Sequence, residues 1–324
     1  MAGQVFAYIE HKNSVVDDTA MELLSAAKRI YPDGNPIAII TGSGALLDTA
    51  CTTLTASYQQ IWKFDHDALA YPNAEVIRKL LIAILPPDAI LLVPHDTFGM
   101  DLSPGLSIKL DSVFVSDVVG FESLDEGNLK LIRQEYSGQV STHMECDISS
   151  GAVINIRPGA FAADERKSAA GQVVDKSSKT KKLTAARRYL EIVEVEAGDV
   201  DITKEDILVS IGRGIGDQDN IEIAQALAKA IGGAVSCSRP IVDAKWLEKA
   251  HQVGSSGKTV KPKVYLALGI SGTFQHLAGV KGNPLIVAVN KNPKAPIFQV
   301  AQVGVITDLH EFVPVLTEKI TKGK

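Results

Sequence analysis

Residues suited to holding an anion are concentrated in one stretch, residues 238–279, of this 324-residue sequence. Arg239 directly follows a serine, and a Gly-Ser-Ser-Gly-Lys turn ends in a second cation, Lys258. A predicted strand over 264–268 then leads into Gly-Ile-Ser-Gly and a Gln-His pair. Glycine-rich turns after strands leave backbone N–H groups free to face an anion, and the two cations add full positive charge. The stretch is therefore predicted to hold something anionic and flat.

These residues resemble the C-terminal FAD-binding domain of the electron transfer flavoprotein alpha subunit, the FixB family. The similar segments are SRP–VDA (238–244), QVG–SGKTV–PK–Y–A–GISG–QHLAG (252–279), IVAVNKNP–APIFQVA (286–301) and GVITDLHEFVPVLTEKI (304–320). Weaker but collinear segments lie upstream, at 91–122, in INIRPGAF (154–161) and in ILVSIGRGI (207–215). The resemblance thus covers essentially the whole chain, which no short glycine pattern does.

The resemblance implies that the C-terminal half binds FAD. The residues that it places at the cofactor are Ser238, Arg239, Gln252, Val253, Gly254, Ser255, Ser256, Gly257, Gly269, Ser271, Gly272, Gln275, His276, Asn290 and Asp308. No side chain is expected to act as a catalyst, because the flavin itself carries out the redox chemistry. No metal site is expected either.

Three of these residues are expected to tune the flavin. Arg239 follows a strand, where open α/β sheets bind ligands, and the resemblance places it against the flavin ring. A fixed guanidinium there would raise the midpoint potential and stabilise the anionic semiquinone. His276, which alone would more often be structural, is implied to donate a hydrogen bond to the N1–C2=O edge. The resemblance also implies that Ser256 lies near flavin N5, at a position where the family commonly carries threonine.

The remaining polar residues are expected to bind the rest of the cofactor. Ser271 and Gly272 are predicted to begin a helix after a strand, which favours the FAD pyrophosphate. The resemblance implies that Asn290 and Asp308 contact the ribityl and adenosine parts. Each of these residues could be a helix cap or a turn residue if taken alone.

The elements that must position these residues alternate between strand and helix, which predicts an α/β protein with two domains. Each domain is expected to be an open, mostly parallel sheet with flanking helices. In the first domain, strands are predicted at 4–9, 36–40, 61–64, 89–93, 114–119, 129–134, 139–146 and 152–156, and helices at 20–30, 45–55, 75–85 and 104–110. Arg157-Pro-Gly-Ala-Phe161 is expected to end that sheet.

The second domain is predicted to be a Rossmann-like FAD-binding domain. Its strands are expected at 207–211, 234–236, 264–268 and 285–289, and its helices at 220–231, 245–251, 273–277 and 309–320. The length of the chain exceeds a typical single core, which supports two domains. We place the boundary between residues 188 and 189, so that the domains are 1–188 and 189–324.

Composition and charge exclude several classes of protein. Hydrophobic content of 45% with 22% charged residues is ordinary for a globular protein, and the net charge of −5 gives nucleic-acid binding no global support. Three scattered cysteines argue against a zinc site or a disulfide framework and fit a reducing compartment. No apolar run is long enough to span a bilayer, and no secretory signal is visible. A cytoplasmic location without membrane insertion is therefore expected.

A basic segment over 176–188 contains six basic and no acidic residues. It is either a docking surface for an acidic partner or a solvated loop whose charge is neutralised by the acidic residues of 189–206. The second interpretation is favoured, because charge runs are usually solvated.

Two other patterns carry less weight. Gly212-Arg-Gly-Ile-Gly216 places its third glycine one residue too early for a dinucleotide fingerprint, and no acidic residue follows the next strand. Asp65, His66 and Asp67 are adjacent, but neighbours on an extended chain point to opposite faces, so they make a poor metal site.

The sequence therefore predicts the alpha subunit of a heterodimeric electron transfer flavoprotein that works with a beta subunit. Electrons would come from an acyl-CoA or other dehydrogenase and leave for a quinone-linked or other acceptor. One alternative is an electron-bifurcating flavoprotein that oxidises NADH with a second FAD in the beta subunit. An NAD-dependent dehydrogenase is an alternative of another class, but it predicts a full glycine fingerprint, and a nucleotide-sensing module without redox activity is a third.

Overall fold

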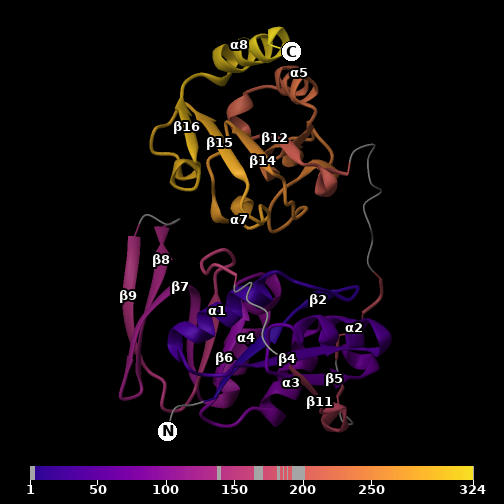
Figure 1. Ribbon diagram of the computed structural model, residues 1–324, viewed down its shortest axis with the longest axis vertical. Coiled ribbons are helices and arrows are strands. Elements are labelled where there is room, and N and C mark those ends of the chain that lie inside the picture. Colours follow the sequence, from indigo (N-terminus) through magenta and orange to yellow (C-terminus); the bar gives the residue numbers. More distant parts are fainter. Residues whose placement is uncertain are drawn as a thin grey trace. The chain divides into compact units, whose positions relative to one another are not determined.

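The computed structural model describes residues 4–136, 140–163, 171–180, 183–184, 186–187, 189–191 and 201–323. The chain forms two compact units, Met1–Glu191 and Ile192–Lys324, which are called the N unit and the C unit below (Figure 1). The boundary predicted after residue 188 stays a prediction, because residue 188 lies outside the described ranges.

The N unit is built on a nine-stranded sheet with the order β11-β5-β4-β1-β6-β10-β7-β8-β9. Its strands are β1 Val5–Ile9, β4 Ile37–Gly42, β5 Gln60–Asp65, β6 Ile90–Pro94, β7 Val113–Asp125, β8 Asn128–Glu135, β9 Val140–Asp147, β10 Ala152–Ile156 and β11 Gln172–Asp175. The strands from β11 to β7 pair in parallel, whereas β7, β8 and β9 are antiparallel. The small hairpin of β2 (His11–Lys12) and β3 (Val15–Val16) follows β1. Strand order reverses at β1, as in doubly wound sheets.

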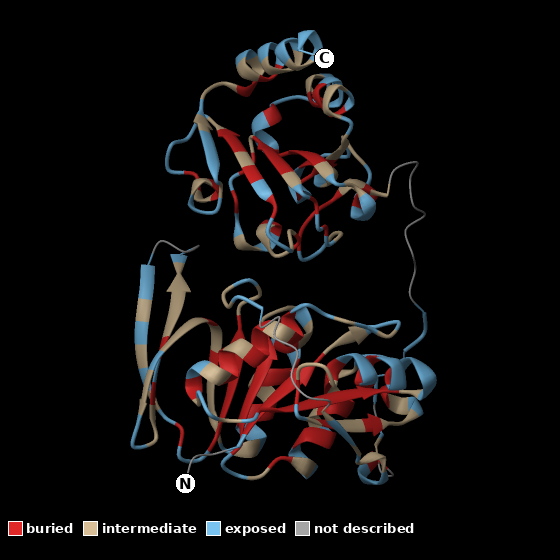
Figure 2. Cartoon of the chain, in the orientation of Figure 1, coloured by how far each residue is buried: buried red, intermediate tan, exposed pale blue. Residues whose placement is uncertain are grey.

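Helices cover both faces of this sheet. They are α1 Thr19–Ile30, α2 Gly44–Leu54, α3 Ala74–Ile84 and α4 Thr97–Leu110. Buried residues of α1 and α2 pack on one face, and those of α3 and α4 pack on the other. Because both faces are covered, β1, β4, β6 and β10 are buried along their whole length, as the red strands of Figure 2 show.

The C unit contains a five-stranded, wholly parallel sheet with the order β13-β12-β14-β15-β16. Its strands are β12 Ile207–Ile211, β13 Ala234–Cys237, β14 Val264–Leu268, β15 Leu285–Asn290 and β16 Val303–Ile306. Helices α5 (Ile221–Ile231) and α8 (Leu309–Lys322) pack on one face. The other face is covered by loops and by the short α7 (Phe274–Leu277). The predicted fold class, two α/β units with mostly parallel sheets, is confirmed.

Several predicted elements are wrong in position. Residues 245–251, which are all described, do not form the expected helix. Helix α6 occupies Arg239–Asp243 instead, and a short 3₁₀ turn, Lys249–His251, follows it. Pro240 fits the first turn of a helix, and Lys245, with a φ of 61°, has left the helical region. Helix α4 begins at Thr97 and contains Pro104, which had been taken as its start.

The N-unit sheet also does not end at residue 161. Strand β11 adds to its far edge beside β5, and β16 likewise adds to the C-unit sheet. Both strands are largely exposed, so they lack the apolar run by which the buried strands were predicted.

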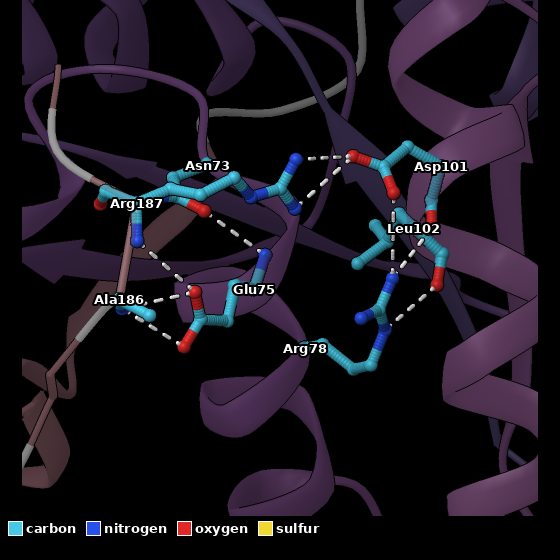
Figure 3. A network of polar contacts seen from close by, with 7 residues as sticks. All are labelled: Asn73, Glu75, Arg78, Asp101, Leu102, Ala186 and Arg187. Carbon is cyan, nitrogen blue, oxygen red and sulfur yellow. Dashed lines mark hydrogen bonds and ion pairs between the residues drawn. The ribbon is translucent and has the colours of Figure 1, made fainter.

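The described part of the basic segment packs on its own unit (Figure 3). The backbone N–H groups of Ala186 and Arg187 donate to the Glu75 carboxylate, and the Arg187 guanidinium lies 3.4 Å from Asp101. Lys176 lies over the Trp62 ring, 3.4 Å from its centroid. Acidic residues of α3 and α4 thus contact this segment. Of the acidic residues of 189–206 that were expected to neutralise it, Glu194, Glu196 and Asp199 lie outside the described ranges, while Asp201 and Asp206 pair with Lys204 and Lys263 of the C unit.

None of the helices in the described ranges combines the length and the apolar character that a bilayer crossing requires.

Candidate flavin site

The predicted site residues of the C unit lie at the carboxyl end of its parallel sheet. Ser238 and Arg239 follow β13, and the Gly269-Ile-Ser-Gly272 turn follows β14. Asn290 is the last residue of β15. Because all five strands run in the same direction, these ends share one edge, where open α/β sheets bind their ligands.

A loop over 252–258 returns to the same edge. Gln252 forms an isolated parallel bridge with Cys237, the last residue of β13, and the Val253 N–H donates to the Cys237 carbonyl at 2.9 Å. The Ser255 N–H donates to the carbonyl of Gln275 at 2.7 Å. The loop is therefore fixed to both β13 and α7, and it brings Ser255 beside the Gln-His pair.

Two glycines of the site permit contacts that no other residue allows. Gly254 has a φ of 138°, and a Cβ there would lie 2.7 Å from the Gln275 carbonyl oxygen. Gly272 has a φ of 81°, and a Cβ there would lie 2.4 Å from the Ile297 nitrogen. Both backbones need the conformational freedom of glycine and the space that a missing side chain leaves.

Ser256 is held by Gln252, which is only 4% exposed. The Gln252 amide donates from Nε2 to Ser256 Oγ over 2.9 Å. Because the serine oxygen accepts this bond, its hydroxyl proton stays available to a ligand acceptor. The serine therefore keeps the hydroxyl chemistry expected of the threonine that is common in the family.

His276 is buried, with 5% of its surface exposed. Its Nε2 lies 2.8 Å from the hydroxyl of Tyr265, which is itself fully buried and donates to Ser210 Oγ at 2.7 Å. Nδ1 of the same ring is also buried, and the ring makes a hydrogen bond with the backbone of Val253. Burial lowers the pKa of His276 to about 4, and an interaction with the Val253 backbone has a smaller, opposite effect.

Arg239 is the first residue of α6, and 69% of its side chain is exposed. Its Nε lies 3.4 Å from a carboxylate oxygen of Asp243, one turn along the helix. A guanidinium has five N–H donors, so this single contact leaves most of them for a ligand. Ser238, which precedes it, is buried and makes no capping hydrogen bond with the helix.

Asn290 and Asp308 are more engaged with the protein itself. The Asn290 amide donates to the Ile270 carbonyl at 2.9 Å and so supports the turn after β14. Asp308 caps α8 through the His310 N–H and forms an ion pair with Lys291 at 2.7 Å. The hydrogen bond with Lys291, followed by that with the His310 backbone, lowers the pKa of Asp308. No contact in the described residues joins either side chain to Arg239 or His276.

The prediction that a helix begins at Ser271 is wrong. Helix α7 begins at Phe274 and has four residues, so its dipole is small. The Gly269–Gly272 segment is instead a turn whose Ser271 carbonyl accepts the Ile297 N–H at 2.9 Å. Backbone groups of this turn, and no helix terminus, are what the site offers a phosphate.

Tyr265 and Ser210 are the polar residues that the sequence analysis missed. Both interrupt apolar strands, VYLAL and ILVSI, and both are fully buried on the same face of the sheet. A polar residue inside a buried strand needs a hydrogen-bond partner, and that requirement was the available signal.

The donor set fits a dinucleotide cofactor with an anionic pyrophosphate and a carbonyl-rich ring. Arg239, Ser256 and the Gly269–Gly272 backbone supply donors for such a cofactor.

Comparison with known protein families gives matches in both units. The sequence model described as "Electron transfer flavoprotein FAD-binding domain" matches residues 201–281. The one described as "Electron transfer flavoprotein domain" matches residues 5–182.

Curated relatives match along the whole chain. The electron transfer flavoprotein subunit alpha of Thermoanaerobacterium thermosaccharolyticum is 31% identical, over 99% of this chain and 98% of the relative. The protein of the same name from Bacillus subtilis is 32% identical, over 98% of each chain. The LctC subunit of the lactate dehydrogenase (NAD(+),ferredoxin) of Acetobacterium woodii is 27% identical, over 98% of this chain and 76% of that subunit.

Proposed function

Because the chain belongs to the electron transfer flavoprotein alpha-subunit family and binds FAD, we propose that it forms a heterodimer with a beta subunit. The heterodimer carries electrons from an acyl-CoA or other dehydrogenase to a quinone-linked or other acceptor. The observation that carries this proposal is the strand-end edge of the C unit, where hydroxyl, guanidinium and backbone donors meet within the span of the FAD-binding domain.

When bound, the flavin supplies the electron chemistry, and the protein supplies binding and electrostatics. We assign FAD contacts to the residues predicted above, from Ser238 to Asp308. Arg239 places positive charge beside the ring, which favours a cofactor that gains negative charge. Ser256, oriented by Gln252, offers a hydroxyl proton to a ring nitrogen. Gly254 and Gly272 let the loops that border the site pack closely against the backbones of Gln275 and Ile297.

The Arg239 assignment is tested by a reductive titration of the heterodimer. Arg239→Ala should lower the midpoint potential, because the positive charge that favours the reduced cofactor is gone. Asp243→Ala is the matched control: it removes the helix partner of Arg239 and keeps the guanidinium. Equal potentials for Arg239→Ala and the wild type would remove that role from Arg239.

The function as a whole is tested by co-expression with a beta subunit encoded by a neighbouring gene. The purified complex should contain FAD, be reduced by a dehydrogenase and its substrate, and reduce a quinone-linked acceptor. A colourless complex that takes up no added FAD would contradict the proposal. A flavin that no dehydrogenase reduces would contradict the carrier role while leaving FAD binding intact.

A second candidate, electron bifurcation, is favoured by one relative. The name of LctC joins lactate dehydrogenation to both NAD(+) and ferredoxin. For this chain, bifurcation would require a second FAD in the beta subunit and reduction by NADH. Two FAD per heterodimer together with rapid bleaching by NADH would support it, whereas one FAD and no reaction with NADH would support the simple carrier.

A further inference from the structure

The C unit contains a long stretch of sequence that has no acidic residue. Residues 249–307 include seven lysines and neither aspartate nor glutamate, although the chain as a whole has a net charge of −5. Two of these lysines are paired with carboxylates from outside the stretch, Lys263 with Asp206 and Lys291 with Asp308, both at 2.7 Å. Positive charge is therefore concentrated on this part of the C unit.

Three of the other lysines lie on two segments that run side by side, and they are called the lysine patch below: Lys258, Lys261 and Lys281. The Val260 N–H donates to the Gly279 carbonyl at 2.8 Å, and the Lys281 N–H donates to the Val260 carbonyl at 2.9 Å. Val260 and Val280 form the resulting parallel bridge, and both belong to the apolar cluster on the loop-covered face of the sheet. Because side chains alternate along an extended chain, Lys261 and Lys281 project from the opposite, outward side.

The charge of the lysine patch is not balanced at every position by the protein itself. Lys258 and Lys281 form no ion pair with the residues that the structure describes. Lys261 is exposed, and the other two lysines are partly exposed. Like charges at neighbouring positions of paired segments repel one another, and a negatively charged surface would remove that repulsion.

The lysine patch directly adjoins the loop over 252–258. Lys258 forms a parallel bridge with Val253, and its carbonyl accepts the Gly254 N–H at 3.3 Å. Gly279 packs so closely on the same loop that a Cβ there would lie 2.3 Å from the Gly254 nitrogen. A molecule that docks on the patch is therefore brought beside the loop that carries Ser256.

We propose that the lysine patch is the docking surface for an acidic surface of the dehydrogenase that reduces the flavin. This inference deepens the proposed function and rests on it. The core of a permanent interface is depleted in lysine, whereas transient electron-transfer encounters are small and gain their rate and orientation from complementary charge. The composition of the patch therefore favours a transient redox partner over the beta subunit. Attraction at long range would raise the rate of association.

The test compares variants that change only the charge of this surface. Lys261→Glu combined with Lys281→Glu reverses two charges, and Lys261→Gln combined with Lys281→Gln removes them. Lys258 is kept, because it lies in the loop of the candidate flavin site. The matched control is Lys229→Glu combined with Lys319→Glu. These are two exposed lysines of α5 and α8, the helices that pack on the other face of the same sheet.

The measurement is the rate at which a dehydrogenase and its substrate reduce the FAD of the heterodimer, followed by stopped-flow absorbance. In about 0.01 M salt, where charges act over about 30 Å, we expect the Glu variant to be reduced about tenfold more slowly and the Gln variant about threefold. In about 1 M salt, where that range is about 3 Å, the differences should disappear. The control should follow the wild type at both salt concentrations.

Equal rates for the Glu variant and the wild type in low salt would overturn the proposal. So would a loss of the same size in high salt, weaker FAD binding or loss of the beta subunit, because the lysines would then serve the cofactor site or the subunit interface. The proposed function fails separately. A heterodimer that no dehydrogenase reduces contradicts both, whereas one that is reduced equally fast with and without the lysine charges contradicts this inference alone.

Discussion

The N unit and the C unit share a parallel α/β architecture but differ in what fills the carboxyl ends of their strands. In the N unit, carboxylates of the chain itself accept the first N–H groups of the helices. Asp17 accepts from Thr19 at the start of α1, Asp65 from Gly44 at the start of α2, and Asp96 from Gly99 at the start of α4. The positions where an anionic ligand could approach are already occupied by negative charge.

In the C unit, the corresponding positions are mostly left open. Asn220 and Ser238, the N-cap residues of α5 and α6, make no capping hydrogen bond, and unlike α1 and α2 these two helices have no neighbouring carboxylate among the described residues that accepts a first-turn N–H; Thr273, the N-cap residue of α7, makes no capping bond either. The exception is Asp308, which caps α8. The comparison teaches that the shared sheet does not decide which unit binds a cofactor. What decides it is whether the N–H groups that follow the strands are bonded by side chains of the protein or left for a ligand.

The two edges also bury opposite kinds of titratable group. Glu10 follows β1, and burial, followed by the charge of Asp96, raises its pKa well above the usual range. In the C unit, burial lowers the pKa of His276 to about 4. Burial thus disfavours the charged form of both groups, but the stabilities of the two units should change with pH in opposite directions.

The largest expected effect comes from crowding a strand-end glycine. Gly272→Ala in the C unit should cost about 3 kcal/mol or more and abolish FAD binding, because the new Cβ meets the Ile297 backbone at a φ of 81°. The matched change, Gly159→Ala in the N unit, has a φ of 83° and open space around its Cβ. It should cost about 1 kcal/mol. Urea unfolding and FAD titration give both values, and equal costs would contradict the account.

The next largest effect is the pH dependence of the stability of the C unit. His276 has a folded pKa below its unfolded value, so the unfolded chain binds more protons between pH 6.5 and 4. The free energy of unfolding should fall by about 3 kcal/mol as pH drops through this window. His276→Gln should flatten that decline. The two tryptophans allow separate measurement, since Trp246 in a Trp62→Phe chain reports on the C unit.

In the N unit, Glu10 should give the stability a pH dependence of the opposite sign. Its folded pKa lies above the unfolded value, so its contribution is present at low pH and is lost as pH rises through the folded pKa. Glu10→Gln, which keeps the shape and stays neutral, should remove this loss. The fluorescence of Trp62 in a Trp246→Phe chain measures the unfolding of the N unit as a function of pH. A stability curve that is identical for Glu10→Gln and its parent between pH 5 and 9 would contradict the assigned pKa shift.

A smaller effect follows from moving a carboxylate into the C-unit edge. Ser238→Asp should weaken FAD binding about tenfold or more, because it places negative charge beside an anionic cofactor. Ser43→Asp makes the same change at the N-cap of α2 in the N unit and should leave FAD affinity as it is. Isothermal titration of the heterodimer compares the two, and similar losses would argue against a C-unit site.

The smallest effect concerns helix starts. Asp65→Ala removes the acceptor for the Gly44 N–H and should cost about 1 kcal/mol. Ser238→Ala removes a side chain that makes no capping bond and should cost much less. Thermal unfolding ranks the two variants. A larger loss for Ser238→Ala would show that the open edge of the C unit is already satisfied by the chain.

The sequence was a good guide to the buried strands and a poor one to exposed strands and short helices. Strands such as β10 and β12 are short, mostly apolar runs bounded by turn residues, each with a single polar residue, so their limits can be read directly. Strand β16 has mostly exposed residues and depends on pairing with β15, which no local pattern reveals. Helix α6 was placed too late because Pro240 was not recognised as a first-turn residue.

For the site, spacing after strands located Arg239 and the glycine turns, because strand ends meet at one edge whatever the details of packing. The sequence could not show that Tyr265 reaches Ser210, 55 residues away, since that contact depends on the register of two strands. Nor could it show the direction of the hydrogen bonds around His276. Those features depend on tertiary packing.

The central claim, that FAD occupies the strand ends of the C unit and not those of the N unit, is tested most directly by hydrogen exchange. The heterodimer would be compared with and without FAD by mass spectrometry of its peptides. We predict slower exchange in peptides that contain the 252–258 loop and the Gly269–His276 segment, with no change around Glu10 or Asp96. Protection confined to the N-unit peptides would contradict the claim.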